Sequence, residues 1–122
     1  MKMQESPEDY LETIYMLSLH SSEVRSIDVA RHLGYSKPSV SVAMKNLREK
    51  EHIKVDEQGF IHLTPSGLEI ANMIYERHTL LSSWLTHLGV PEDVAAADAC
   101  KMEHAISAES FLALKSLTRF SD

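Results

Sequence analysis

Residues 26–50 read S-I-D-V-A-R-H-L-G-Y-S-K-P-S-V-S-V-A-M-K-N-L-R-E-K, and this stretch decides the fold. Its apolar residues repeat twice with a helical period, which predicts short helices over 26–33 and 38–50. Ser26 is expected to cap the first helix, and Gly34 to stop it. Two short helices joined by so short a turn are typical of a helix-turn-helix.

The residues that follow change from the helical period to the period of two that marks strands. Two short segments rich in apolar residues, 53–55 and 60–63, flank D-E-Q-G at 56–59, where Gly59 can take the positive φ of a hairpin turn. Amphipathic patterns predict further helices over 7–19, 65–88, 91–105 and 107–120. A helix-turn-helix followed by a hairpin predicts a mainly α chain with an N-terminal winged helix-turn-helix.

The composition is that of an ordinary globular chain, but the charge is divided unevenly. Apolar residues make up 43% of the 122, and no run approaches the ~18 that a membrane span needs. A single cysteine and the lack of a signal peptide predict a cytoplasmic protein. The net charge of −6 argues against nucleic acid, yet residues 24–54 carry seven basic and three acidic side chains. This basic block favours an anionic partner bound by one surface; the alternative is a solvated helix pair that happens to be basic.

The start of the second short helix suits contact with DNA. In S-K-P-S-V-S-V, residues 36–42, small hydroxyl groups and a proline ring let the backbone approach phosphates at a helix N-terminus. Pro38 can pack against thymine methyl groups, and the lack of Arg, Asn and Gln in this stretch favours apolar contact and DNA shape over direct hydrogen-bond readout. Taken singly, each residue favours a structural role, Ser36 as an N-cap and Pro38 as a first-turn residue, and the DNA-binding prediction depends on the joint pattern. The predicted DNA-binding residues are Arg25, Ser36, Lys37, Pro38, Ser39, Ser41, Lys45 and Lys54, the last on the wing.

A second pattern lies in D-A-C-K-M-E-H, residues 98–104. Cys100, Glu103 and His104 are spaced i, i+3 and i+4, so they share one face of a helix. A thiol, a carboxylate and an imidazole on one face indicate a metal site. Candidate ligands on other predicted helices are Asp9, Glu12 and His78. The alternatives are that the acid pair lies on a solvated face and that the lone histidine is structural.

Taken together, these segments resemble the diphtheria toxin repressor family of metal-dependent transcriptional regulators. The motifs that carry the likeness occur in the family's order and cover nearly the whole chain. They are P-E-D-Y-L-E-T-I-Y-M-L at 7–17, the helix-turn-helix, H-L-T-P-S-G at 62–67, E-R-H-T-L-L at 76–81 and C-K-M-E-H at 100–104. The chain is most similar to the short manganese-transport-regulator branch, because it stops at Asp122 and we expect no SH3-like domain.

The resemblance implies a winged helix-turn-helix DNA-binding domain over 1–64 and a helical metal-binding and dimerisation domain over 65–122. In that family, metal bound between the N-terminal helix and the dimerisation-domain helices activates a dimeric repressor for operator binding. The positions that match the ligands of the manganese branch are Asp9, Glu12, His78, Glu103 and His104.

Cys100 departs from the manganese branch, which has Glu there, and matches the iron branch, which has Cys. Because a thiolate is softer than a carboxylate, we expect a divalent transition metal with Fe²⁺ favoured and Mn²⁺ second. The iron branch's ancillary site needs an acid and a histidine where this chain has Ser82 and Ala96, so that site is expected to be absent.

The predicted function is a metal-dependent repressor that controls metal homeostasis genes. Its expected partners are a palindromic double-stranded operator and a second copy of the chain, with no membrane. The chain is not expected to be an enzyme, since it has no H-E-x-x-H motif and no Gly-rich phosphate loop. The alternative is a metal-independent, thiol-based redox-sensing transcriptional regulator that uses Cys100.

Apolar residues in the last helices exceed what so short a segment needs internally, which favours a dimer interface over the alternative, a closed monomer core. They are Trp84, Leu85, Leu88, Phe111, Leu112, Leu114, Leu117 and Phe120.

Overall fold

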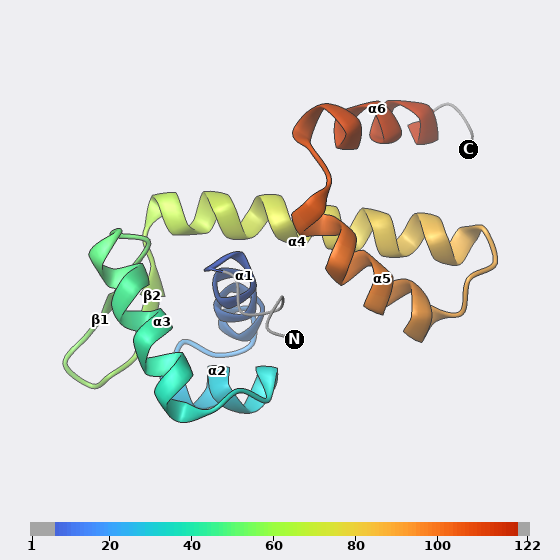
Figure 1. Ribbon diagram of the computed structural model, residues 1–122. Coiled ribbons are helices and arrows are strands. Elements are labelled where there is room, and N and C mark those ends of the chain that lie inside the picture. Colours follow the sequence, from blue (N-terminus) through green and yellow to red (C-terminus); the bar gives the residue numbers. More distant parts are fainter. Residues whose placement is uncertain (1–6, 120–122) are drawn as a thin grey trace. The chain divides into compact units, whose positions relative to one another are not determined.

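The computed structural model describes residues 7–119. Phe120, which the sequence predicts to lie in a dimer interface, is outside the described residues. In this part the chain forms six helices and one two-stranded sheet, which confirms the mainly α class (Figure 1). The elements are α1 (Pro7–Ser18), α2 (Ser26–Leu33), α3 (Lys37–Glu49), β1 (Ile53–Val55), β2 (Ile61–Leu63), α4 (Pro65–His87), α5 (Glu92–Ala105) and α6 (Ala108–Arg119). None of these helices is long and apolar enough to cross a membrane.

The chain divides into two compact units, Met1–Met73 and Ile74–Asp122, hereafter unit one and unit two. The division falls within α4, which contributes its first turns to unit one and the rest to unit two. The domain boundary at 64/65 remains a prediction from the sequence.

In unit one, α2 and α3 form the predicted helix-turn-helix, with one correction at the start of α2. Ser26 is the first helical residue and not the cap, because the backbone N–H of Arg25 donates to Asp28 Oδ2 at 2.9 Å and makes Arg25 the N-cap. Gly34 ends the helix as predicted, with the left-handed φ of 73° that its missing β-carbon permits.

The wing follows α3 directly. Strands β1 and β2 pair antiparallel, with Lys54 opposite His62, and Gly59 takes a φ of 86° in the turn, as predicted. After the wing, Gly67 lies in the first turn of α4 against the His52 carbonyl, which a β-carbon at this position would overlap. Glycine at 67 therefore allows α4 to begin directly beside the base of the wing.

The core of unit one joins α1 to the helix-turn-helix and the wing. Its buried side chains come from α1, the segment before α2, α2, α3, both strands and the first part of α4. They include Leu11, Ile14, Val29, Leu47 and Ile53, each at most 2% exposed. At about 25 cal/mol per Å² of apolar surface, such burial is the main stabilising contribution in a unit of this size.

Unit two has a smaller core, to which α4, α5 and α6 all contribute. Leu81, Ala99 and Phe111 are buried there, and Trp84 packs against Phe111 with ring centroids 5.8 Å apart. Phe111 and Trp84 therefore contribute to the core of their own unit, while a part for them in a dimer interface remains a prediction from the sequence. Other residues of the dimer-interface prediction are exposed in the described part of the chain. They are Leu88, Leu112, Leu114 and Leu117.

Candidate nucleic-acid interface and metal centre

One face of α3 is exposed along its length. Pro38, Ser41, Val42 and Lys45 follow the spacing i, i+3, i+4 and i+7, and all are exposed. Val40, Met44 and Leu47, on the opposite face, fix α3 in the core of unit one. The prediction from sequence missed Val42, which is 60% exposed and adds an apolar group beside Pro38. The sequence already indicated this position, because a residue four places after Pro38 lies on the same face of a helix.

At the start of α3, Ser36 and Ser39 are hydrogen-bonded to each other. Ser36 Oγ accepts a hydrogen bond from the Ser39 backbone N–H at 3.3 Å and donates to Ser39 Oγ at 2.9 Å. Ser36 therefore serves as the N-cap, as the alternative interpretation held. Lys37, beside it, is exposed.

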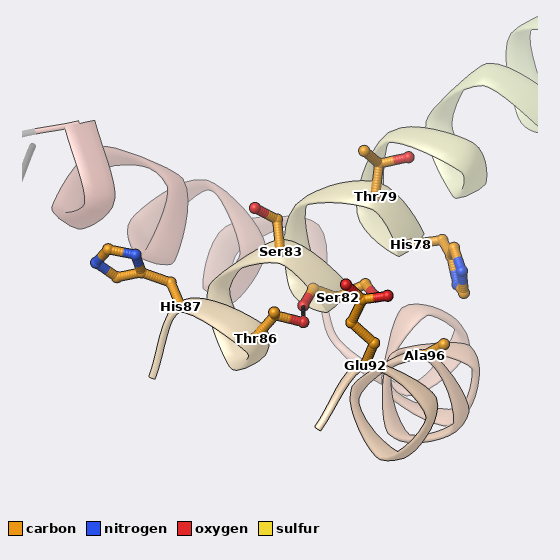
Figure 2. A pocket seen from close by; sticks show the side chains of 8 residues that line it. All are labelled: His78, Thr79, Ser82, Ser83, Thr86, His87, Glu92 and Ala96. Carbon is orange, nitrogen blue, oxygen red and sulfur yellow. Dashed lines mark hydrogen bonds between the residues drawn. The ribbon is translucent and has the colours of Figure 1, made fainter. Parts of the chain in front are cut away.

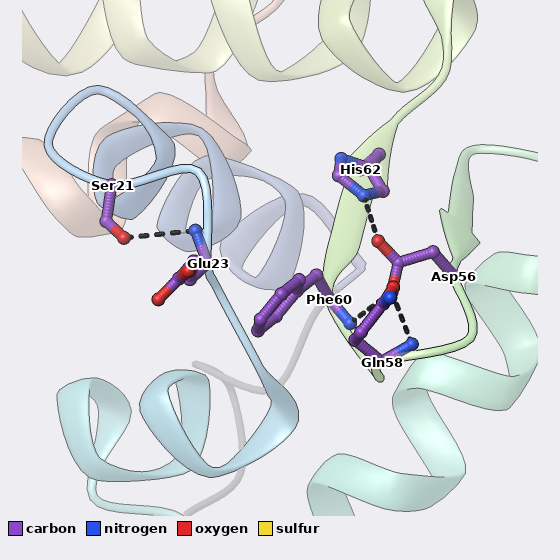
Figure 3. A network of polar contacts seen from close by, with 6 residues as sticks. All are labelled: Ser21, Glu23, Asp56, Gln58, Phe60 and His62. Carbon is purple, nitrogen blue, oxygen red and sulfur yellow. Dashed lines mark hydrogen bonds and ion pairs between the residues drawn. The ribbon is translucent and has the colours of Figure 1, made fainter.

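The wing carries a polar network centred on Asp56 (Figure 3). Its Oδ1 accepts the backbone N–H groups of Gln58 and Phe60 at 3.0 and 2.9 Å, and its Oδ2 lies 2.8 Å from His62 Nε2. The hydrogen bond with His62 is the first cause that holds the pKa of Asp56 below its usual value. Lys54 and His62 face each other across the strands and both are exposed.

Arg25 lies at the base of this wing. Its guanidinium carbon is 4.6 Å from the centre of the Phe60 ring, a cation–π distance. The side chain remains exposed, so an aromatic ring orients a positive charge at the surface of unit one.

The candidate metal ligands of unit two come from α4 and α5. His78 Nδ1 lies 2.8 Å from Glu103 Oε1, and His104 Nε2 lies 3.3 Å from Glu103 Oε2. Each carboxylate oxygen of Glu103 thus has one imidazole beside it. Cys100, half-buried, is one turn earlier on the same helix. The structure therefore brings together the three ligands that spacing predicted on α5 and the histidine predicted on α4.

The burial of Glu103 indicates whether the residues around it suit a metal ion. Its side chain is 0% exposed, and its Oε2 has no hydrogen-bond donor among the residues described. A carboxylate in such surroundings is costly unless a cation compensates it. A buried carboxylate, two imidazoles and a nearby thiol are ligand types that divalent transition metals accept, so these residues fit such an ion.

Asp9 and Glu12 belong to α1 in unit one. They are spaced i, i+3 and so share a face of that helix. With 5% and 8% of their surfaces exposed, they are buried, which contradicts the interpretation of a solvated acidic pair.

A cavity of about 560 Å³ in unit two is lined by His78, the same residue that contacts Glu103 (Figure 2). His78 and His87 stand at opposite ends of the view, and hydroxyl side chains predominate between them. Ser82 and Ala96, the two positions at which the resemblance leads us to expect no ancillary metal site, both line it.

Models of one protein family match both halves of the chain. Residues 2–63 match "Iron dependent repressor, N-terminal DNA binding domain", and residues 64–122 match "Iron dependent repressor, metal binding and dimerisation domain". The transcriptional regulator MntR of Salmonella typhimurium is 35% identical over 112 residues, which cover 92% of this chain and 71% of that relative.

Solved structures are similar over nearly the whole chain. The metal-dependent transcriptional regulator MtsR has a TM-score of 0.89 at 26% identity, covering 97% of this chain and 55% of its own. A manganese-dependent transcriptional repressor in complex with manganese has a TM-score of 0.86 at 26% identity, covering 94% of this chain and 53% of its own. The chain spans about half the length of these two proteins.

The two family models follow one another along the chain without a gap, and the first places the exposed face of α3 in a DNA-binding domain. The second covers the cluster around Glu103 with a metal-binding and dimerisation domain. The chain therefore belongs to the diphtheria toxin repressor family of metal-dependent, DNA-binding transcriptional repressors, in its manganese-regulator-like branch.

Proposed function

We propose that this protein is a cytoplasmic homodimer that represses metal homeostasis genes when a divalent transition metal is bound. Its partner is a palindromic double-stranded operator, which two copies of α3 read together. The observation that carries the proposal is Glu103, a fully buried carboxylate with an imidazole beside each oxygen.

The proposed ligands are His78, Cys100, Glu103 and His104 from unit two, with Asp9 and Glu12 from α1. The burial of both acids of α1 and their match to the family's ligand positions support this assignment. A bound divalent ion supplies positive charge that compensates these carboxylates. To act as a switch, the ion must bind the DNA-competent arrangement more tightly than the inactive one.

We propose Fe²⁺ as the preferred metal and Mn²⁺ as the second. The carboxylates suit both ions, whereas the thiolate of Cys100 shifts the preference away from Mn²⁺ and toward the later metals. Zn²⁺ and Co²⁺ share that softer preference, but zinc in cells is normally buffered.

On the DNA side, Pro38 and Val42 offer apolar surface to thymine methyl groups, and Lys37 and Lys45 offer charge to phosphates. Ser41, on the same exposed face, is a candidate for hydrogen bonds to phosphates or base edges. Arg25, at the base of the wing, and Lys54, on strand β1, add positive charge at the wing. The N-cap bonds of Ser36 and Ser39 leave these serines as minor contacts.

The test is an operator-binding titration under anaerobic conditions with Fe²⁺, Mn²⁺, Co²⁺ and Zn²⁺ in turn. Operator fragments are first selected from genomic DNA with the metal-loaded protein. We expect metal-dependent binding that His104→Ala abolishes, while His87→Ala, a matched change at an exposed histidine of α4, leaves it intact. Binding that persists in chelator and is lost on peroxide treatment would instead establish the thiol-based alternative.

A further inference from the structure

Arg77 is a buried cation for which the sequence predicts no role, although it lies in the E-R-H-T-L-L motif at 76–81. It immediately precedes His78 on α4 and is 8% exposed, although its side chain ends in a positively charged guanidinium. A charge in this position needs partners, because an unpaired buried charge is strongly destabilising.

The bonds of this guanidinium go to the end of α5. Arg77 Nη1 donates to the backbone carbonyl of Glu103 at 3.0 Å and to that of Ile106 at 2.9 Å. Ile106 is the C-cap of α5, and the last carbonyls of a helix have no partner within it. A cation at this end also compensates the negative pole of the helix dipole. Arg77 therefore closes the last turn of α5 from a neighbouring helix.

This turn is the one that carries Glu103 and His104. Two consecutive residues of α4 thus hold one residue of α5: Arg77 bonds the main chain of Glu103, while His78 contacts its side chain. The Arg77 guanidinium carbon also lies 5.6 Å from the centre of the Phe111 ring, which anchors α6 in the core of unit two.

From this juxtaposition we propose that Arg77 is a positioning residue for the metal centre. It sets the Glu103 carboxylate and the His104 imidazole in register with His78 by fixing the C-terminal turn of α5. The inference rests on the proposed function, since it concerns the ligands of that same site. Groups that orient metal ligands in this way typically change metal affinity by about 10- to 100-fold when they are removed.

The experiment measures Co²⁺ binding by the full chain, because the absorption spectrum of Co²⁺ reports its coordination directly and needs no DNA. Arg77→Met removes the charge and both bonds while keeping a side chain of similar length. We expect Co²⁺ affinity to fall by about 10- to 100-fold and the spectrum to change. Arg77→Lys, which keeps a donor and the charge, should restore part of this affinity.

Lys115→Met is the matched control, since it removes a cation that pairs with Glu76 at 2.7 Å at the surface of the same unit. It should bind Co²⁺ as the unaltered chain does. Circular dichroism of the metal-free proteins establishes that each variant is folded, and Arg77→Gln replaces Arg77→Met if the latter is not.

A folded variant without the guanidinium that binds Co²⁺ with unaltered affinity and spectrum would overturn the role of Arg77 alone. A purely structural role predicts this result, together with a lower unfolding temperature of the metal-free protein. If the unaltered chain itself binds no Co²⁺, the proposed function fails, and the inference about Arg77 fails with it.

Discussion

At the scale of single residues, Cys100 is the ligand on which the proposed metal preference depends. We expect Cys100→Glu to keep metal-dependent DNA binding but to move the ranking toward Mn²⁺, since it replaces a soft ligand with a hard one. The measurement is operator affinity with Mn²⁺ and with anaerobic Fe²⁺, compared between this variant and the unaltered chain. If the unaltered protein responds best to Mn²⁺ and Cys100→Ala behaves like it, the thiol is a packing residue.

Asp56 gives a residue-scale prediction about pH. Because its pKa is lowered in the folded protein from the usual 3.8, the unfolded state binds a proton more readily. The contacts of the ionised Asp56 carboxylate therefore stabilise the folded protein fully above pH 3.8. This stabilisation is lost as the pH falls through the lower pKa that Asp56 has in the folded state. We expect Asp56→Asn to flatten the pH dependence of the unfolding temperature in this acidic window. Glu57→Gln, a neighbouring change in the same turn, is the control and should leave that dependence unaltered.

Site residues that follow a helical spacing could be predicted from the sequence. The role of Arg77 could not be predicted in this way. Cys100, Glu103 and His104 share a helical face that any helix over 91–105 would produce. Arg77, by contrast, bonds backbone carbonyls 26 and 29 residues away, and backbone acceptors leave no pattern in the sequence.

At the scale of elements, α3 makes a prediction about salt. Lys37 and Lys45 are exposed on the helix that we propose to read DNA. Replacing both with Ala should weaken binding to all sequences and reduce the slope of log affinity against log salt by about one unit for each phosphate that is no longer neutralised. Titrations with specific and nonspecific duplexes at several salt concentrations measure this slope, with Lys101→Ala on α5 as control. An unchanged slope would place the DNA-binding surface on another element.

Element boundaries were predictable wherever a residue type restricts the backbone. Gly34 and Gly59 adopt the positive φ values that their sequence context indicated, and Pro65 begins α4 as expected. The N-cap of α2 is Arg25, one residue before the Ser26 that the common use of serine as a cap predicts. It is the Asp28 carboxylate, reaching back to the Arg25 N–H, that defines this end.

At the scale of the whole molecule, the exposed leucines of α6 predict the oligomeric state. Leu112 and Leu117 are 59% and 66% exposed and belong to the segment that matches a dimerisation domain. We expect the double variant Leu112→Glu/Leu117→Glu to be a monomer in sedimentation velocity, because a dimer would bury unpaired charges. Operator affinity should fall toward that of a single half-site.

The control for this prediction is Leu19→Glu, which alters a leucine that is 55% exposed in unit one. It should leave the dimer intact. Helix content of the double variant should also be unaltered, since neither side chain contributes to the core. A double variant that still sediments as a dimer would assign the interface to other residues.

The pairing of Trp84 with Phe111 has a spectroscopic consequence. The chain has one tryptophan, and its ring packs in the core of unit two. Intrinsic tryptophan fluorescence is therefore a local probe of unit two, whereas circular dichroism sums the helices of both units. Recorded together in a denaturant titration, the two signals reveal whether unit two opens before the rest of the chain or with it, without any attached label.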